Sequence, residues 1–405
     1  MVLLRYLISF LIIVGTNSVY IYATGPMLKI VILIDLLLLI YRIIQVYTTR
    51  INTSVPVREV IMNLFYGLLF SVFFIVHIND SILNNTGHLM LLLGLFAMTF
   101  LFVPILESDL RLWLKSFINV LVGLAIISIV FYLLGTTLHF LHPTSYVSVN
   151  WGGQRTFPSY HGLYFDTQTI TILSHVFARN SGIFVESPVF GGMLGIAAVF
   201  SFVLLQEKIN WKMMVVLLAL ITTTSSTGLA LYAISAYIYL VKRNRDNQTS
   251  FTFFVIKWIG RLLALGLIVY LGTVLISAKL GTSSGSLRLD DFQSGFHAFL
   301  KHPLVGNGLL TIDAISSFMT SANRHIWVNG MPYYNTGLAS SFVQVISDGG
   351  VLLSLLYFLP FFEKKGNWLF KGLIAIVHLL SIYTYTPLLF LLISILRTDI
   401  NKERN

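Results

Sequence analysis

The chain has 405 residues, of which 56% are hydrophobic and only 10% are charged, and its mean hydropathy is +0.82. A soluble domain carries about 25% charged residues, so this composition excludes an ordinary soluble protein and favours an integral membrane protein. The absence of cysteine excludes disulfides, a thiol nucleophile, iron–sulfur clusters and thiolate zinc sites. There is no HExxH motif, Walker loop or nucleotide-binding glycine fingerprint. We therefore expect no metal and no cofactor.

Apolar windows of about 20 residues, enough to cross a hydrocarbon core of about 30 Å, recur along the chain. They predict an all-α polytopic membrane protein, one integral membrane domain over 1–405, with about 12 transmembrane helices in a range of about 10–12. The expected spans are 4–23, 27–47, 59–78, 88–106, 112–135, 188–205, 211–226, 227–241, 253–277, 341–360, 367–382 and 384–397. The first resembles a signal peptide, but it continues through Tyr20 and Tyr22 without a small-residue cleavage site, and we assign it as a span.

Lys and Arg in short loops mark the cytoplasmic side, because membrane insertion disfavours moving positive charge outward. With the N-terminus inside, every short basic loop is cytoplasmic, and so are both termini. These regions hold Arg50, Arg58, Arg111, Lys115, Lys208, Lys212, Lys242, Arg243, Arg245, Lys364, Lys365, Arg397, Lys402 and Arg404. The net charge of +10 follows largely from this topology, so we expect no nucleic-acid partner.

Two long polar segments, 136–187 and 278–340, fall on the outer side as large extracytoplasmic loops. They hold six of the 26 basic residues, namely Arg155, Arg179, Lys279, Arg288, Lys301 and Arg324. The short outer loops at 24–26, 79–87 and 223–227 contain no Lys or Arg. Topology does not account for these six residues, so they are candidates to bind a ligand.

In the first outer loop, aromatic and polar residues alternate around Tyr160 and His161. This pattern fits either a sugar-stacking surface or an aromatic belt at the membrane interface. Further on, Arg179 and Glu186 lie seven residues apart beside a membrane entry. Unpaired charges there are costly, so the two residues either pair with each other or meet a charged ligand.

The second outer loop contains an expected amphipathic helix on the membrane surface, from Ser286 to Lys301, ended by Pro303. Its apolar stripe consists of Phe292, Phe296, Phe299 and Leu300. Acids near its start and basic groups near its end suit the helix dipole. Asp290 and Asp291 are therefore interpreted as helix-start acids, with a metal pair as the alternative. His325 is either a solvated loop residue or a base.

Four motifs in a fixed order carry a family resemblance. They are Arg-x-x-Gly-Ile-Phe-x-Glu at 179–186, Thr-Thr-Ser-Ser-Thr-Gly at 223–228, Arg288 with His-Pro-Leu-Val-Gly-Asn-Gly at 302–308, and Ser-Ser-Phe-Val-Gln at 340–344 with Asp-Gly-Gly at 348–350. In this order and with this outer location, the chain resembles the Wzy-type polysaccharide polymerase and O-antigen ligase superfamily. It looks most like the polymerases of capsular polysaccharides and exopolysaccharides.

The resemblance implies a glycosyltransferase of the bacterial cytoplasmic membrane with its active face outside. Such enzymes transfer a growing glycan from undecaprenyl diphosphate to a hydroxyl of the next lipid-linked repeat unit, with either stereochemical outcome. The lipid diphosphate is already an activated leaving group, so no metal is needed. Membrane lipid, a flippase and a chain-length regulator are candidate partners. Alternatives are a ligase, which passes the glycan to another acceptor, and a lipid-linked oligosaccharide flippase or exporter.

The resemblance also suggests roles for particular residues. Arginine forks can hold a diphosphate and stabilise the charge that develops as the sugar leaves. Arg179 and Arg288 match the arginines of the family and are the expected clamp. Many relatives carry a histidine where this chain has Ala339, so the base is open between Glu186, which we favour, and His325 or Asp348. The other candidate substrate-binding residues are Arg155, Tyr160, His161, Lys301, His302, Arg324, Ser340 and Asp348.

Overall fold

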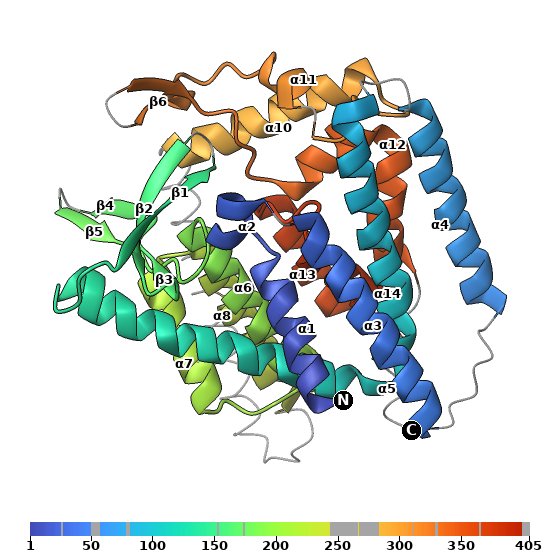
Figure 1. Cartoon of the computed structure of the whole chain (residues 1–405), viewed down its shortest axis with the longest axis horizontal. Helices are drawn as coiled ribbons and strands as arrows, with labels where there is room; N and C mark the ends of the chain where they lie inside the picture. The colour runs from blue at the N-terminus through green and yellow to red at the C-terminus, as the bar shows by residue number, and fades with distance from the viewer. Residues whose placement is uncertain are drawn as a thin grey trace. The chain divides into compact units, whose positions relative to one another are not determined.

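The computed structural model describes residues 1–25, 27–49, 57–77, 82–151, 154–172, 175–243, 266, 283–310, 312–328, 331–363 and 366–398. The chain divides into two compact units. The first contains residues 1–116, 149–155 and 288–405, and the second contains residues 117–148 and 156–287. Both units are mainly helical, as the hydrophobic pattern predicts (Figure 1).

The first unit is built around long apolar helices. They are α1 (Val2–Val14), α2 (Val19–Thr24), α3 (Met27–Thr49), α4 (Val57–Val76), the first part of α5 (Ile82–Phe131), α12 (Ser341–Phe362), α13 (Trp368–Leu380) and α14 (Pro387–Arg397). Helix α12 packs against α4, α13 and α14, and α1 packs against α3 and α14. The helices occupy the expected positions, whereas the expected span 253–277 lies outside the described residues apart from Gly266.

The expected span 4–23 is not one continuous helix. The chain breaks between α1 and α2 at Asn17, whose φ of 52° is left-handed and cannot continue a helix. The Asn17 amide then donates to the carbonyl of Ile382 at 2.7 Å and accepts from the Tyr22 hydroxyl at 3.0 Å. A side-chain amide therefore bridges this break to the turn between α13 and α14.

The expected spans 88–106 and 112–135 belong to one long helix, α5, which kinks at Asp109. Asp109 has non-helical φ and ψ of −129° and 21°. Its carboxylate accepts from the hydroxyl of Tyr41 at 2.7 Å, and the same hydroxyl accepts from Arg5 at 3.2 Å. The kink falls between the two expected spans and is held by polar side chains from α1 and α3.

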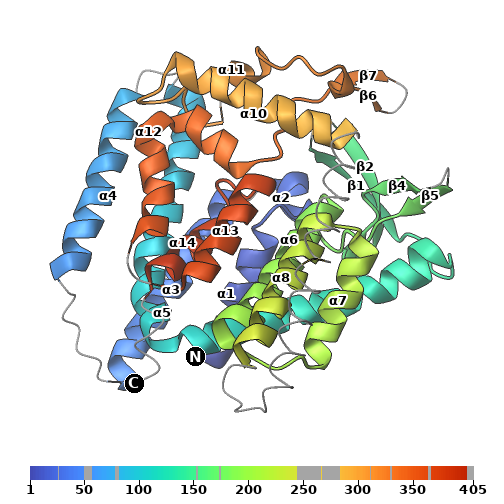
Figure 2. The same cartoon turned by 180° about the vertical axis from the view of Figure 1, so that it is seen from behind.

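The second unit holds the end of α5, the short π-helix η1 (Tyr132–Thr137), α6 (Ser187–Val199), the π-helical turn η2 (Phe200–Leu205), α7 (Trp211–Thr223) and α8 (Ser226–Arg243). Helices α6 and α8 lie side by side in both views (Figure 2). Gly191, Gly195 and Gly228 lie at their crossing: a Cβ on Gly228 would lie 2.2 Å from the carbonyl oxygen of Gly191. Small residues therefore let the two backbones touch, as in tightly packed membrane helices.

Three small antiparallel sheets depart from the predicted all-α class. Strands β1 (Ser145–Asn150), β2 (Gln154–Tyr160) and β3 (Tyr164–Phe165) form one sheet in that order, β4 (Thr169–Ile172) pairs with β5 (His175–Ala178), and β6 (His325–Val328) pairs with β7 (Met331–Tyr334). All these described strands lie in the two polar segments. The segments are rich in β-branched and aromatic residues, which favour extended backbone once the apolar helical pattern ends.

Within the described residues, three helical stretches are long and apolar enough to cross a membrane by length and composition: Gly87–Thr137, Ser187–Leu205 and Ser341–Phe362. Shorter apolar helices accompany them, including α1, α7, α13 and α14. Large apolar side chains are also exposed in rows along α3 and α4, among them Ile32, Leu36, Ile43, Leu64, Leu68 and Ile75. Such rows point to surfaces that meet lipid or another protein, because soluble monomers rarely expose large apolar patches.

The crossing of α6 and α8 predicts a sharp difference between two helical glycines. We expect Gly228→Ala to destabilise the protein by about 1–3 kcal/mol, since the new methyl group overlaps the backbone of Gly191. Gly123→Ala on α5 is the matched control, because a Cβ there meets nothing within 4 Å. It should be neutral or stabilise by up to about 1 kcal/mol. Thermal unfolding of the detergent-solubilised variants measures the difference, and equal stabilities would contradict this packing.

Candidate functional site

Arg179 follows β5, and its side chain is fixed against the C-terminus of α7. Its Nε and Nη2 donate to the carbonyl of Thr223 at 3.0 and 2.9 Å, and Nη2 also reaches the carbonyl of Thr224 at 3.4 Å. Thr223 is the last residue of α7, where carbonyl groups lack helical partners and the helix dipole favours a cation. Among the described residues, Nη1 has no hydrogen-bond partner, so one edge of the guanidinium is fixed and one is open.

Burial lowers the pKa of Arg179, and the charge of Glu186 opposes that shift. A guanidinium remains charged after such a change because its ordinary pKa lies far above neutral pH. Glu186 is the N-cap residue of α6, in extended conformation, and its carbonyl accepts from the N–H groups of Val189 and Phe190. The charge of Glu186 therefore acts on Arg179, but within the described residues the Arg179 guanidinium forms no ion pair with Glu186.

The residues between Arg179 and Glu186 form a tightly bonded turn. The Asn180 side chain donates to Ser128 and Thr222 at 3.2 and 2.9 Å and accepts from the N–H of Gly182 at 3.1 Å. Gly182 has a φ of 56° and packs against Phe190, so a side chain there would meet both strain and crowding. These hydrogen bonds fix the backbone of the turn after Arg179 and so help to orient the Arg179 side chain.

Arg288 lies on α10 (Ser283–Lys301) in the first unit, and it makes a similar contact. Its Nη1 donates to the carbonyl of Leu380 at 3.0 Å. Leu380 is the last residue of α13, just as Thr223 is the last residue of α7. Each of the two expected clamp arginines therefore donates to the carbonyl group at the end of a helix within its own unit.

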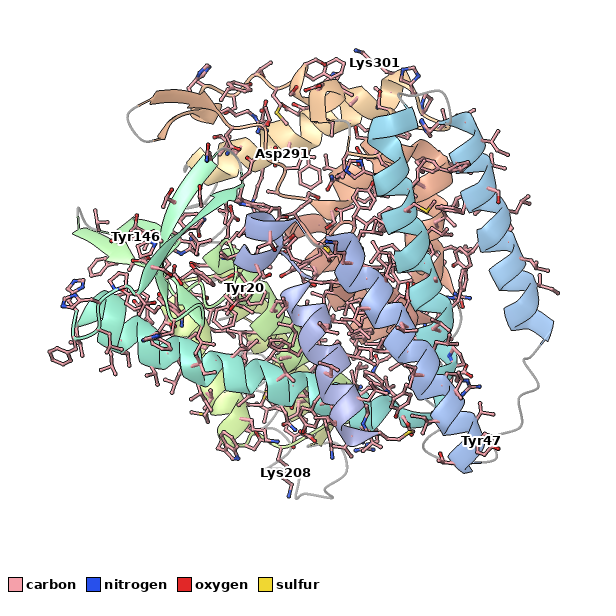
Figure 3. All side chains as sticks on the ribbon, in the orientation of Figure 1. Tyr20, Tyr47, Tyr146, Lys208, Asp291 and Lys301 are labelled. Atoms are coloured by element: carbon pink, nitrogen blue, oxygen red, sulfur yellow. The ribbon has the colours of Figure 1, made fainter. Side chains whose placement is uncertain are left out.

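Arg324 is not available to bind a diphosphate, which corrects the prediction made for it. Its side chain is 0% exposed and forms ion pairs with Asp290 and Asp291 of α10, while Nη1 donates to the carbonyl of Asn335 at 2.9 Å. Figure 3 labels Asp291 on this helix. Hydrogen bonds from Arg324 and from the residues around Thr320 and Ala339 surround the two carboxylates.

The roles expected for Asp290 and Asp291 are corrected as well. Helix α10 begins at Ser283 and has no acid in its first turn, so these residues lie in its middle and do not stabilise its start. Burial raises the pKa of Asp291. Burial acts in the same direction on Asp290, but hydrogen bonds from Arg324 and Thr320 outweigh it and lower the pKa of Asp290. The cluster ties α10 to the segment that leads into α12.

The last two motifs form one backbone joint. Helix α12 breaks at Gly350, whose φ of 55° and ψ of −151° are outside the helical region. The freed N–H groups of Val351 and Leu352 donate to the carbonyls of Pro303 and Leu304 at 2.8 and 3.0 Å. A Cβ on Gly306 would lie 2.3 Å from the carbonyl oxygen of Asp348. The His-Pro-Leu-Val-Gly-Asn-Gly block and the Asp-Gly-Gly break can therefore pack this closely only because Gly306 and Gly350 have no side chains.

Asp348 and Ser340 have structural contacts in this joint, and neither is exposed to bind a substrate as predicted. Asp348 is 1% exposed and accepts from the N–H of Leu310 at 3.0 Å and from the hydroxyl of Tyr385 at 2.9 Å. Ser340 is 2% exposed and is the N-cap of α12, accepting from the N–H of Val343 at 3.4 Å. Asp348 thus ties α12 to Leu310 and Tyr385, and Ser340 caps the first turn of α12.

The other predicted binding residues fall into buried and exposed groups. Tyr160 is buried against Gly135, Phe131 and Tyr164, so it packs the first loop and does not offer an open stacking face. His161, Lys301, His302 and His325 are exposed. Lys301 lies 4.6 Å from the Phe318 ring centre, and His325 packs edge-on against Tyr334. Arg155 is half-buried, and its Nε has no partner among the described residues.

The sequence reasoning missed two features. Backbone carbonyls at helix ends hold the side chains of Arg179 and Arg288, and no sequence pattern marks such carbonyls. Asp166 ends the aromatic stretch in the first loop and is half-buried, with its pKa raised by burial and lowered in part by His139. The aromatic residues before it were a signal of an unusual environment. No cluster of three or more His, Asp or Glu side chains suited to a metal ion occurs among the described residues.

Comparison of the chain with family models, with curated proteins and with solved structures gives no match.

The buried cluster makes Arg324 a stability residue. We expect Arg324→Ala to lower the free energy of unfolding by about 3–5 kcal/mol, because it leaves two buried carboxylates without their counter-charge. Adding Asp291→Asn should recover part of this loss. Lys301→Ala, at the exposed end of the same helix, should change the stability far less. Thermal unfolding and limited proteolysis in detergent measure the effect; an Arg324→Ala protein as stable as the Lys301→Ala protein would rule out the cluster.

Proposed function

We propose that the chain is an integral membrane glycosyltransferase of the polysaccharide-polymerase type. It acts on the outer face of the bacterial cytoplasmic membrane and joins lipid-linked oligosaccharide repeat units into a capsular or extracellular polysaccharide. The donor is a growing glycan on undecaprenyl diphosphate, and the acceptor is a hydroxyl group of the next lipid-linked unit. The order of the four motifs and the contacts of Arg179 support this proposal.

Membrane embedding is supported by the apolar surface of the molecule. The exposed rows on α3 and α4 consist of long aliphatic residues at helical spacing, such as Leu36 at 53% and Leu68 at 61% exposure. In water these rows would be unfavourable, whereas hydrocarbon chains of lipids solvate them without loss. The three long apolar helices have the length that a bilayer core requires.

The observation that carries the proposal is the state of Arg179. Its Nε and Nη2 are held by helix-end carbonyls, while Nη1 remains open among the described residues. A guanidinium fixed in this way loses little further conformational freedom when it binds an anion. It therefore suits a diphosphate whose negative charge increases as the glycosidic bond breaks. Arg288, held by the carbonyl of Leu380, is proposed for the same task.

The reaction proposed for this site is a group transfer. The acceptor hydroxyl oxygen attacks the anomeric carbon of the donor, a new C–O bond forms, and the bond from that carbon to the diphosphate oxygen breaks. The electron pair leaves with the diphosphate, where the arginines stabilise it. The hydroxyl proton passes to a protein base. Of the three bases considered from the sequence, Glu186 and the exposed His325 remain, since Asp348 is 1% exposed.

Polymer length in cells tests this function. We expect Arg179→Ala and Arg288→Ala to yield little or no long polymer at normal protein level, since the leaving diphosphate loses its counter-charge. Arg179→Lys should restore only part of the polymer that Arg179→Ala loses, because an ammonium group cannot hold both the helix end and a diphosphate. Lys208→Ala, an exposed basic residue before α7, is the control and should leave polymer length unchanged. Gel analysis of the polysaccharide, with immunoblots of the protein, provides the measurement.

The same experiment separates the alternatives. A strain lacking the chain should accumulate single lipid-linked repeat units on the outer leaflet if the protein is a polymerase. A ligase would leave polymer on its lipid carrier, and loss of a flippase would keep the single units on the cytoplasmic leaflet. Normal polymer in the Arg179→Ala and Arg288→Ala strains would refute the proposed diphosphate clamp.

A further inference from the structure

Asp166 lies in the second unit on a segment that is bonded directly to the Arg179 motif. The N–H of Phe165 donates to the carbonyl of Gly182 at 2.9 Å, and the N–H of Arg179 donates to the carbonyl of Gln168 at 2.9 Å. These two bonds continue the pairing of β4 with β5, in which Thr169 faces Ala178. Arg179 thus lies opposite Gln168. Asp166 is two residues before Gln168, which is about 7 Å along an extended chain.

The surroundings of Asp166 are unusual for a carboxylate in a polar loop. The side chain is half-buried, and its carboxylate oxygens receive no hydrogen bond from the described residues. The titratable groups that face it are His139, Tyr160 and Tyr164, from the turn after η1, from β2 and from β3. Both tyrosines are buried, and the pKa of each is raised chiefly by burial and further by the charge of Asp166.

These surroundings leave Asp166 with unused accepting capacity. An ordinary structural carboxylate is surrounded by donors, as Asp290 is by Arg324 and Thr320. Burial without donors disfavours the charged form and raises the pKa of Asp166, so the group binds a proton more readily than an exposed Asp. A carboxylate that is reachable, lacks donors and holds protons more readily than usual fits a general base.

We propose that Asp166 is the base of the transfer and takes the proton of the acceptor hydroxyl. In this step the O–H bond breaks, an Asp166 oxygen gains the proton, and the hydroxyl oxygen forms the bond to the anomeric carbon as the diphosphate leaves. This inference rests on the proposed function. It assigns the proton to a residue outside the four motifs, whereas Glu186 stays engaged with the charge of Arg179.

The first test compares isosteric variants in cells that lack the natural chain. Asp166→Asn removes the accepting charge with almost no change of shape, and we expect it to reduce polymer formation by at least about 100-fold at normal protein level. Asp313→Asn, which alters an exposed carboxylate on α11 (Ile312–Ser316), is the matched control and should be without effect. Wild-type polymer levels in the Asp166→Asn cells would overturn the proposal.

The second test distinguishes a base from a structural residue by its pH profile. Purified protein is assayed with the lipid-linked saccharides extracted from cells lacking the chain. The wild-type rate should rise with pH and level off above the pKa of Asp166, because only the ionised carboxylate accepts a proton. Asp166→Glu should shift the midpoint, while Arg179→Lys should lower the rate at every pH and leave the midpoint in place.

The outcomes of the two proposals are distinguishable. If cells lacking the chain make normal polymer, the proposed function itself fails. If Arg179→Ala abolishes polymer but Asp166→Asn does not, only the role of Asp166 fails. If Asp166→Asn does not reach the membrane, the Asp166→Glu profile decides, and a midpoint identical to that of the wild type refutes the proposal. A pH dependence that disappears in Glu186→Gln would assign the base to Glu186 instead.

Discussion

Backbone N–H and C=O groups that leave a helix must find new partners, and in an apolar protein this requirement determines most of the local structure. The break of α12 at Gly350 frees the N–H groups of Val351 and Leu352, and the turn after α10 supplies their acceptors. The break between α1 and α2 is bridged by the amide of Asn17. At the ends of α7 and α13, the donors come from Arg179 and Arg288. Polar motifs therefore lie where helices stop.

This requirement also explains how the side chain of an arginine in a loop can be held rigid. A long side chain loses rotamer freedom when it binds a ligand, and that loss weakens binding unless the protein has already fixed it. Two hydrogen bonds from Arg179 to the carbonyl of Thr223 fix the plane of its guanidinium. The crossing of α6 and α8 at their glycines in turn places the end of α7. The packing of α6 against α8 therefore helps to set the direction in which the Arg179 guanidinium donates its hydrogen bonds.

Apolar windows of about 20 residues predicted the approximate positions of the long described helices, because burial in apolar surroundings dominates their stability. They placed the kink of α5 between two windows and the break between α7 and α8. They missed the turn at Asn17, where a single left-handed residue outweighs an apolar window, and the small sheets of the two polar segments. At the site, motif order singled out Arg179 and Arg288. It could not show that Arg324 is buried, because its partners Asp290 and Asp291 lie more than 30 positions away.

The use of hydrogen-bonding capacity separates four polar residues into two kinds. Arg324 and Asp348 are buried and bonded to protein groups, so a ligand would have to displace those bonds, and both residues preserve the fold. Arg179 keeps one open edge, and Asp166 keeps open acceptor positions while lying in partly buried surroundings. A polar group that lacks hydrogen-bond partners near a buried region lowers stability. Such groups are tolerated where a bound molecule supplies the missing partners. Unused donors and acceptors, more than membership of a motif, therefore mark the groups in the two polar segments that can still bond to another molecule.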